Sequence, residues 1–238
     1  MKKLNTKKLF MPIVFLGLFI SIGNASAQSV FEGAFFQGAI GYTNVGSSFD
    51  QSSSLLNQNG VFPQNISTDN LSVLTGNIGG GYNFRIAPKW LLGLSIDFMP
   101  VTSGSANSKV TTNLPGVIVP NSLVGSYQMK NPINIAVLPS YELSNNQLVY
   151  GKVALSTASL IYSDSVTPAT SVLVGGFTLG LGYKQALQNQ LYIFAEGLYT
   201  NFLDYTANIN GPYQGVANTS IDIKASGYTF LFGAGYRF

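Results

Sequence analysis

The chain ends on Tyr228-Thr229-Phe230-Leu231-Phe232-Gly233-Ala234-Gly235-Tyr236-Arg237-Phe238, in which two kinds of side chain alternate. The even-numbered positions carry Tyr, Phe and Ala, whereas the odd-numbered positions carry Thr, Leu, Gly and Arg. An alternation with a period of two is typical of a β-strand, because successive side chains point to opposite faces of a sheet. This stretch therefore predicts a strand with one aromatic face and one face of small or polar side chains.

The same division recurs along the chain, with bulky apolar residues in one phase and Gly, Ala, Ser, Thr and charged residues in the other. We expect strands at 32–43, 71–84, 90–99, 133–142, 149–156, 173–184, 191–203 and 228–238. Most approach or exceed the length of about 9 to 11 tilted residues that crosses a bilayer, and single-chain bacterial barrels have an even number of strands.

The connections between these segments alternate in length. They are short at 85–89, 144–147 and 186–190, and longer at 44–70, 102–127, 163–171 and 205–222. Short turns at one end and long loops at the other are typical of membrane barrels. The sequence thus predicts an all-β fold, an eight-stranded antiparallel transmembrane up-and-down β-barrel.

The composition excludes several kinds of site. Only 9% of the 238 residues are charged, 46% are hydrophobic, and the chain has no cysteine and no histidine. Disulfides, thiolate zinc sites, imidazole ligands and Cys or His nucleophile relays are therefore excluded, and we expect no metal and no cofactor. Four of the twelve basic residues lie in the first eight, so the rest of the chain has eight basic and nine acidic residues. Such a balance offers no electrostatic surface for nucleic acid.

The N-terminal segment has the three parts of an export signal. Met1 to Lys8 is basic, Leu9 to Ile22 is apolar, and Ala25-Ser26-Ala27 ends on the small residues that a signal peptidase reads. The apolar part is shorter than a membrane-spanning helix and contains Pro12. We therefore expect residues 1–27 to be a cleaved signal peptide and residues 28–238 to form one barrel domain in the outer membrane of a Gram-negative cell.

Charged residues of the predicted strands share the phase of the small residues. A Lys or Arg facing lipid near the bilayer midplane would cost about 2 to 4 kcal/mol, so the bulky phase should face lipid and the charged phase the lumen. Lys152 and Glu196 lie at comparable heights above their short turns, and we expect them to be partners. An interior ion-pair network is favoured over acid-base catalysis. Its candidate members are Asp97, Glu142, Lys152, Lys184, Glu196 and Arg237.

The C-terminal strand, with outward Tyr228, Phe230, Phe232, Tyr236 and Phe238, resembles the signal by which outer membrane proteins are recognised for assembly. Further glycine and aromatic patterns make nearly all of the chain after the signal resemble the small bacterial outer membrane β-barrel family that includes opacity proteins and the transmembrane domain of outer membrane protein A. These patterns are Gly38-Ala39-Ile40-Gly41-Tyr42, Gly79-Gly80-Gly81-Tyr82-Asn83-Phe84, Gly180-Leu181-Gly182-Tyr183-Lys184 and Ile193-Phe194-Ala195-Glu196-Gly197-Leu198-Tyr199-Thr200.

The resemblance implies outer membrane lipid, the barrel assembly machinery and periplasmic chaperones as partners. It implies no fixed chemistry, because family members are structural anchors, adhesins, host-interaction surfaces or narrow pores. Small barrels that act on lipid A use a histidine, which this chain lacks, so we expect no enzyme. The predicted loops are neutral and rich in Ser, Asn, Gln and Gly, which fits host or surface ligands and an inert hydrophilic coat equally well. We expect a structural or surface-interaction protein of the adhesin or opacity kind, with a narrow pore for ions or small apolar solutes as the alternative.

Overall fold

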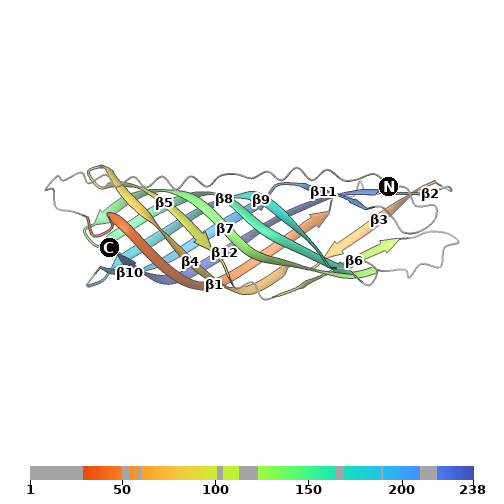
Figure 1. Cartoon of the computed structure of the whole chain (residues 1–238), viewed down its shortest axis with the longest axis horizontal. Helices are drawn as coiled ribbons and strands as arrows, with labels where there is room; N and C mark the ends of the chain where they lie inside the picture. The colour runs from red at the N-terminus through yellow and green to blue at the C-terminus, as the bar shows by residue number, and fades with distance from the viewer. Residues whose placement is uncertain are drawn as a thin grey trace, which may run out of the picture.

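Eight strands close into a ring in the computed structural model, which describes residues 29–49, 54–57, 60–100, 104–112, 123–164, 169–188, 190–209 and 219–238. Each strand of the ring is antiparallel to both neighbours, and the last strand closes on the first (Figure 1). In ring order they are β1 (Gly33–Phe49), β4 (Leu71–Ala87), β5 (Trp90–Phe98), β7 (Leu123–Ser144), β8 (Gln147–Asp164), β9 (Thr170–Ala186), β10 (Leu191–Phe202) and β12 (Thr219–Arg237). The predicted eight-stranded up-and-down barrel is confirmed.

One end of the barrel carries the short connections and the C terminus. Two-residue turns join β4 to β5 and β7 to β8, at Pro88-Lys89 and Asn145-Asn146. Lys89 has a φ of 64° and Gln190, which precedes β10, has a φ of 67°. A positive φ is what a tight connection between twisted antiparallel strands requires. We call this the short-turn end and the opposite one the long-loop end.

The long connections contain more strand than the sequence predicts. The predicted loops at 44–70, 102–127, 163–171 and 205–222 were wrong over most of their described residues, while 50–53, 58–59, 102–103, 113–122, 165–168 and 210–218 lie outside the described residues. They include the ends of β1, β7, β8, β9 and β12, and four further strands: β2 (Ser54–Asn57), β3 (Gly60–Thr68), β6 (Ala106–Thr112) and β11 (Tyr205–Ile209). Figure 1 shows these four strands toward the end opposite the C terminus.

The cause of this error is visible on β7. Past Ile133 the inward residues Met129 and Tyr127 remain buried and apolar, while the outward residues change to Lys130 and Gln128. The register shifts between Lys130 and Ile133, where Asn131 has a φ of 53°, and beyond this irregularity the alternation resumes with a polar outer face, as in a strand that has one side in water. The prediction ended each strand where the outward residues stop being bulky and apolar, although the hydrogen-bonded ladder between the strands does not end there.

The two faces of the barrel wall are assigned as predicted. On β5, Leu91, Ser95 and Asp97 are buried inside, whereas Leu94 and Ile96 are exposed on the outside. Among the described residues, no helix has the length and hydropathy needed to cross a membrane.

Inward glycines are needed where neighbouring strands curve closely around the lumen. A Cβ at Gly81 would lie 2.1 Å from the backbone oxygen of Leu94 and 2.8 Å from the Phe35 ring. A Cβ at the outward Gly175 would have no atom within 4 Å. The narrow wall therefore requires glycine at 81 and tolerates a side chain at 175.

We predict that Gly81→Ala destabilises the barrel and that Gly175→Ala does not. Overpacking against a backbone oxygen should lower the free energy of unfolding by about 1 to 3 kcal/mol. At Gly175, alanine should leave it unchanged or raise it by about 0.5 kcal/mol, because glycine is entropically unfavourable in a strand. Denaturant unfolding of the folded barrel measures both. Equal effects of the two substitutions would contradict this account of the inward glycines.

Candidate functional site

The lumen is the place where the described polar side chains concentrate, and it is filled in layers. Along β8, Leu148 and Tyr150 come first, then Lys152, then Ser156 and Ala158, all pointing inward and buried. The mouth layer, at the short-turn end, contains Phe31, Phe35, Leu91, Ala136, Leu138, Leu148, Tyr150, Ala154, Tyr192 and Phe194. The loop-end layer contains Val45, Leu71, Val73, Ala106, Tyr127, Met129, Ala158, Val174 and Phe202.

Between these two apolar layers, Lys152 bridges two carboxylates. Its Nζ lies 2.7 Å from Asp97 Oδ2 and 2.7 Å from Glu196 Oε1. The Tyr150 hydroxyl donates to Glu196 Oε2 at 3.0 Å. All four side chains are buried, so the ions are compensated by one another and by the tyrosine rather than by water.

Lys184 lies in the same layer but is held differently. Its Nζ donates to Gln37 Oε1 at 3.2 Å and lies over the rings of Phe35 and Tyr192, 4.2 Å and 4.7 Å from their centroids. The Tyr192 hydroxyl donates to the same Gln37 oxygen at 3.0 Å. Within the described residues Lys184 has no ion pair, so cation–π contacts and one hydrogen bond stabilise its charge. We call Asp97, Lys152, Lys184, Glu196 and Gln37 the polar layer; the rings of Tyr150 and Tyr192 belong to the mouth layer, and their hydroxyls bond to this layer.

The other two predicted members of the network lie at the short-turn mouth, apart from the polar layer. The carboxylate of Glu142 is 3.3 Å from Arg85 Nη2, and Arg85 Nε is 2.9 Å from Glu32 Oε2. Arg237 donates from Nη1 to the backbone oxygen of Glu32 at 3.2 Å. Sequence reasoning missed Arg85 because it assigned residues 85–89 to a turn, although Arg85 continues the inward phase of β4.

The aromatic residues of the predicted assembly signal lie on the outer surface of β12. Tyr228, Phe230, Phe232, Tyr236 and Phe238 are all exposed, and Arg237 points the other way. Their role in assembly stays a prediction.

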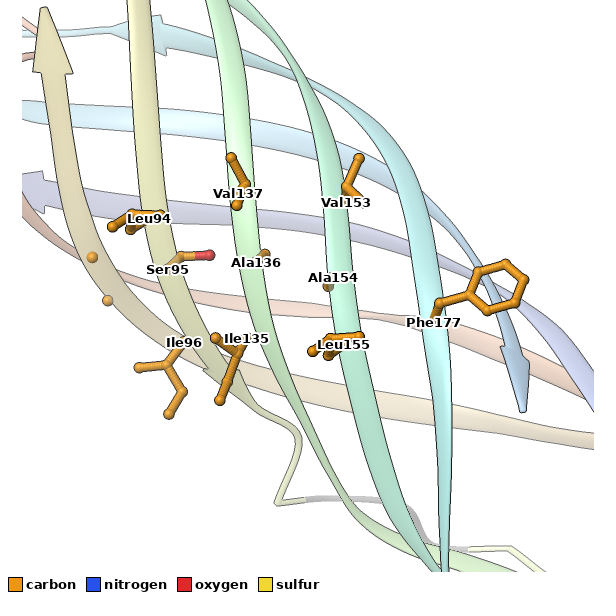
Figure 2. Close-up of a pocket in the computed structure, with 12 residues that line it drawn as sticks. Leu94, Ser95, Ile96, Ile135, Ala136, Val137, Val153, Ala154, Leu155 and Phe177 are labelled. Carbon is orange, nitrogen blue, oxygen red and sulfur yellow. The ribbon is translucent and has the colours of Figure 1, made fainter. Parts of the chain in front are cut away.

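A groove of about 580 Å³ runs over the outside of β5, β7 and β8 (Figure 2). Its floor is formed by positions with small side chains, Ser95, Ala136 and Ala154, which belong to the inward phase. Its flanks are apolar, so it offers no charged group for chemistry. The flanking side chains in Figure 2 are Leu94, Ile96, Ile135, Val137, Val153, Leu155 and Phe177.

Beyond the end of β5, β6 takes the place beside β7 and pairs in turn with β3. Pairing of β4 with β5 ends at Ile78 and Phe98, so within the described part of the chain residues 71–77 of β4 pair only with β1. After the end of β5, Gly104 lies so close to Val73 that a Cβ there would be 2.2 Å from Val73 Cγ1. Gly104 therefore packs against Val73 and Leu71 of the loop-end layer.

This arrangement is a packed set of compensated charges, with two lysines and two carboxylates in the polar layer. No group of three or more acidic residues in the described part of the chain is arranged to hold a metal ion. In the described part of the lumen, the charged side chains of the polar layer are buried and can stabilise the barrel.

Comparison with known proteins identifies the fold. No protein-family model and no curated protein matches the sequence. The outer membrane protein OprG from Pseudomonas aeruginosa matches with a TM-score of 0.61 at 17% identity, over 89% of this chain and 99% of that one. The outer membrane protease OmpT from Escherichia coli matches with a TM-score of 0.50 at 8% identity, over 90% of this chain and 99% of that one. The attachment invasion locus protein Ail of Yersinia pestis matches with a TM-score of 0.42 at 16% identity, over 87% of this chain and 99% of that one. The chain thus has the fold of the small outer membrane β-barrels that its sequence resembles.

We predict that Lys152 and Glu196 are energetically coupled. Lys152→Met or Glu196→Gln alone leaves a buried charge less compensated, and each should lower the free energy of unfolding by about 3 to 5 kcal/mol. The double variant should lose clearly less than the sum of the two. Unfolding titrations of the lipid-inserted barrel test this as a double-mutant cycle. Lys130→Met, which removes an exposed cation, is the matched control, with an effect within about 0.5 kcal/mol. Additive losses would contradict the coupling.

Proposed function

We propose that this chain is an integral outer membrane β-barrel, exported by the predicted signal peptide 1–27, that acts as a surface-interaction protein of the adhesin or opacity kind. An outer belt of bulky apolar side chains supports the membrane location. Ile40, Leu155 and Leu181 are 77%, 74% and 76% exposed. A contiguous apolar surface of this kind is unfavourable in water and favourable against lipid.

The observation that carries the proposed role is the one-sided extension of the barrel. β7 has 22 residues, whereas about 9 to 11 residues of a tilted strand cross a bilayer. Most of the excess of 11 to 13 residues, about 36 to 43 Å of strand at roughly 3.3 Å per residue, lies at the long-loop end, where β2, β3, β6 and β11 add to the sheet. The other end has short turns. A strand-built platform outside the belt at one end holds the loops rigidly, and loops on a rigid scaffold are where binding is concentrated.

The filled lumen supports a role at the surface over one in transport or catalysis. Lys152, Asp97 and Glu196 meet at mid-lumen, and apolar layers lie on both sides of them. The chain has no histidine for the acid-base relays of lipid-modifying barrels. We propose a non-enzyme whose partners are outer membrane lipid, the assembly machinery and chaperones that receive its C-terminal strand, and a surface ligand that recognises neutral hydrogen-bonding groups.

Removing the platform tests this role. In the variant, short turns replace residues 50–68 and 101–122, which deletes β2, β3 and β6. Proteoliposomes that carry the wild-type barrel should bind to cultured epithelial cells, and the variant should bind no better than empty liposomes. Asn145→Gly in the opposite turn is the control and should bind as wild type. Heat-modifiable gel mobility reports whether each barrel is folded. Undiminished binding by the folded variant would contradict the proposal.

A narrow pore for small apolar solutes is the second candidate, and two observations favour it. The loop-end layer lines the lumen with apolar side chains, and within the described chain residues 71–77 of β4 have no strand partner on the β5 side. An apolar solute that entered between the loops would meet Val73, Met129 and Phe202 of this layer. Ions are disfavoured, because both apolar layers lie in their path.

A filling substitution separates the two candidates. In the transport case, wild-type liposomes should take up a small apolar probe such as naphthalene, and Ala158→Trp should slow uptake at least about tenfold, the equivalent of 1.4 kcal/mol. Ala158 is buried in the loop-end layer, so a larger ring there fills the path. Planar bilayers should show no steady ion conductance with either protein. Uptake equal to that of protein-free liposomes would exclude this candidate.

A further inference from the structure

The chain enters the mouth of the barrel before β1 begins. Residues Ser29 to Glu32 precede the ring, and the side chain of Phe31 is only 3% exposed. Phe31 belongs to the mouth layer together with Leu91, Leu138 and Leu148. The side chain of Phe31, which precedes the eight strands of the barrel, therefore completes the mouth layer at the short-turn end.

Polar contacts fix this segment across the mouth. Asn83 Nδ2 donates to the backbone oxygen of Phe31 at 2.8 Å. Arg85 Nε binds Glu32 at 2.9 Å, and the same guanidinium binds Glu142 of β7, whose carboxylate also accepts from the Ser29 hydroxyl. Arg85 thus links the segment to β7, and its ion pairs are only partly shielded from water.

Gly33 joins this segment to the first strand. Its φ is +113°, a backbone conformation that side-chain-bearing residues rarely adopt. The ladder between β1 and β4 begins at Gly33 and Asn83, so Ser29 to Glu32 pair with no strand of the ring. The segment can therefore leave the mouth without breaking any strand pairing of the barrel.

We propose that Ser29–Glu32 is a movable stopper that closes the short-turn mouth of the lumen, with Phe31 as its plug, Arg85 as its clamp and Gly33 as its hinge. In the closed state Phe31 separates the water outside the mouth from the polar layer. When the clamp is released, the mouth layer opens to solvent while the barrel itself stays intact. This inference concerns the end opposite the proposed interaction platform and does not depend on it.

Thiol accessibility tests the stopper, because the chain has no cysteine of its own. Ser140, on β7 and 2% exposed, lies one inward position deeper than Glu142. Ser140→Cys places a single thiol behind Phe31. In lipid nanodiscs, a charged methanethiosulfonate reagent should modify this thiol slowly when the stopper is otherwise wild type. Adding Phe31→Ala should raise the rate at least about tenfold, the equivalent of 1.4 kcal/mol.

Arg85→Gln tests whether the stopper moves, since it keeps the Phe31 ring and removes only the clamp. It should also speed modification of the Ser140→Cys thiol, because loss of the ion pair with Glu32 lets the segment leave the mouth. Two controls should keep the slow rate: Val30→Ala, at a 41% exposed side chain of the same segment, and Lys89→Gln, which removes an exposed cation at the same end.

Heat-modifiable gel mobility restricts the comparison to folded barrels, and Arg85→Gln keeps the test decisive if Phe31→Ala fails to fold. Rapid modification with the wild-type stopper would overturn the closed mouth. An unchanged slow rate in folded Phe31→Ala would overturn the role of Phe31 as plug. Acceleration by Phe31→Ala without acceleration by Arg85→Gln would overturn the clamp and leave a fixed plug.

Discussion

The rest of this structure depends on where Lys152 can be placed. A lysine on the outer face would lie in the apolar belt, so its side chain must point into the lumen, where Asp97 and Glu196 compensate its charge. Because side chains alternate along a strand, this one inward residue fixes the phase of all of β8 up to its ends. The antiparallel register then carries the constraint around the ring, since Lys152 pairs with Gly180 on β9 and every neighbour follows. A slip of one residue on β5, β8, β9 or β10 would bring Asp97, Lys152, Lys184 or Glu196 to the lipid-facing side.

A narrow ring also explains why the interior is layered. Eight strands leave room for side chains and little else, so each large inward residue needs a small one across from it. Gly182 accommodates the Tyr150 ring and Gly235 accommodates the Tyr192 ring, because a Cβ at either glycine would overlap those rings at 2.2 Å. The glycine pattern in the sequence is thus the complement of the aromatic residues in the lumen, and both contribute to a barrel that is closed by its own side chains.

Much of this could be predicted from the sequence, because one strong rule acts on it. Charged side chains cannot share the lipid-facing side of a strand with the bulky apolar ones, so the alternation alone gives the phase of each of the eight strands. The Lys152–Glu196 pair follows from the similar height of the two residues above their short turns. Outside the lipid, charged and polar side chains can lie on the outer face, so the rule no longer applies there. The extensions of β1, β7, β8, β9 and β12 were missed because their outer residues are polar, and Arg85 was assigned to a turn because it stands at a strand end. The place of Phe31 could not be predicted, because a single aromatic residue before the first strand has no periodicity to mark which way it points.

The short β5 has a further consequence for the dynamics of the wall. β5 has nine residues and stands between β4 with 17 and β7 with 22, so the pairing of β4 has a notch beyond the end of β5. Residues 71–77 pair with β1 but have no strand partner on the β5 side within the described chain, so the alternate N–H and C=O groups that point to that side have no cross-strand hydrogen bond. Local opening free energies are lowest where the ladder is one-sided. Amide hydrogens facing the notch are therefore the ones that exchange with deuterium first, while the rest of the ring keeps its protons.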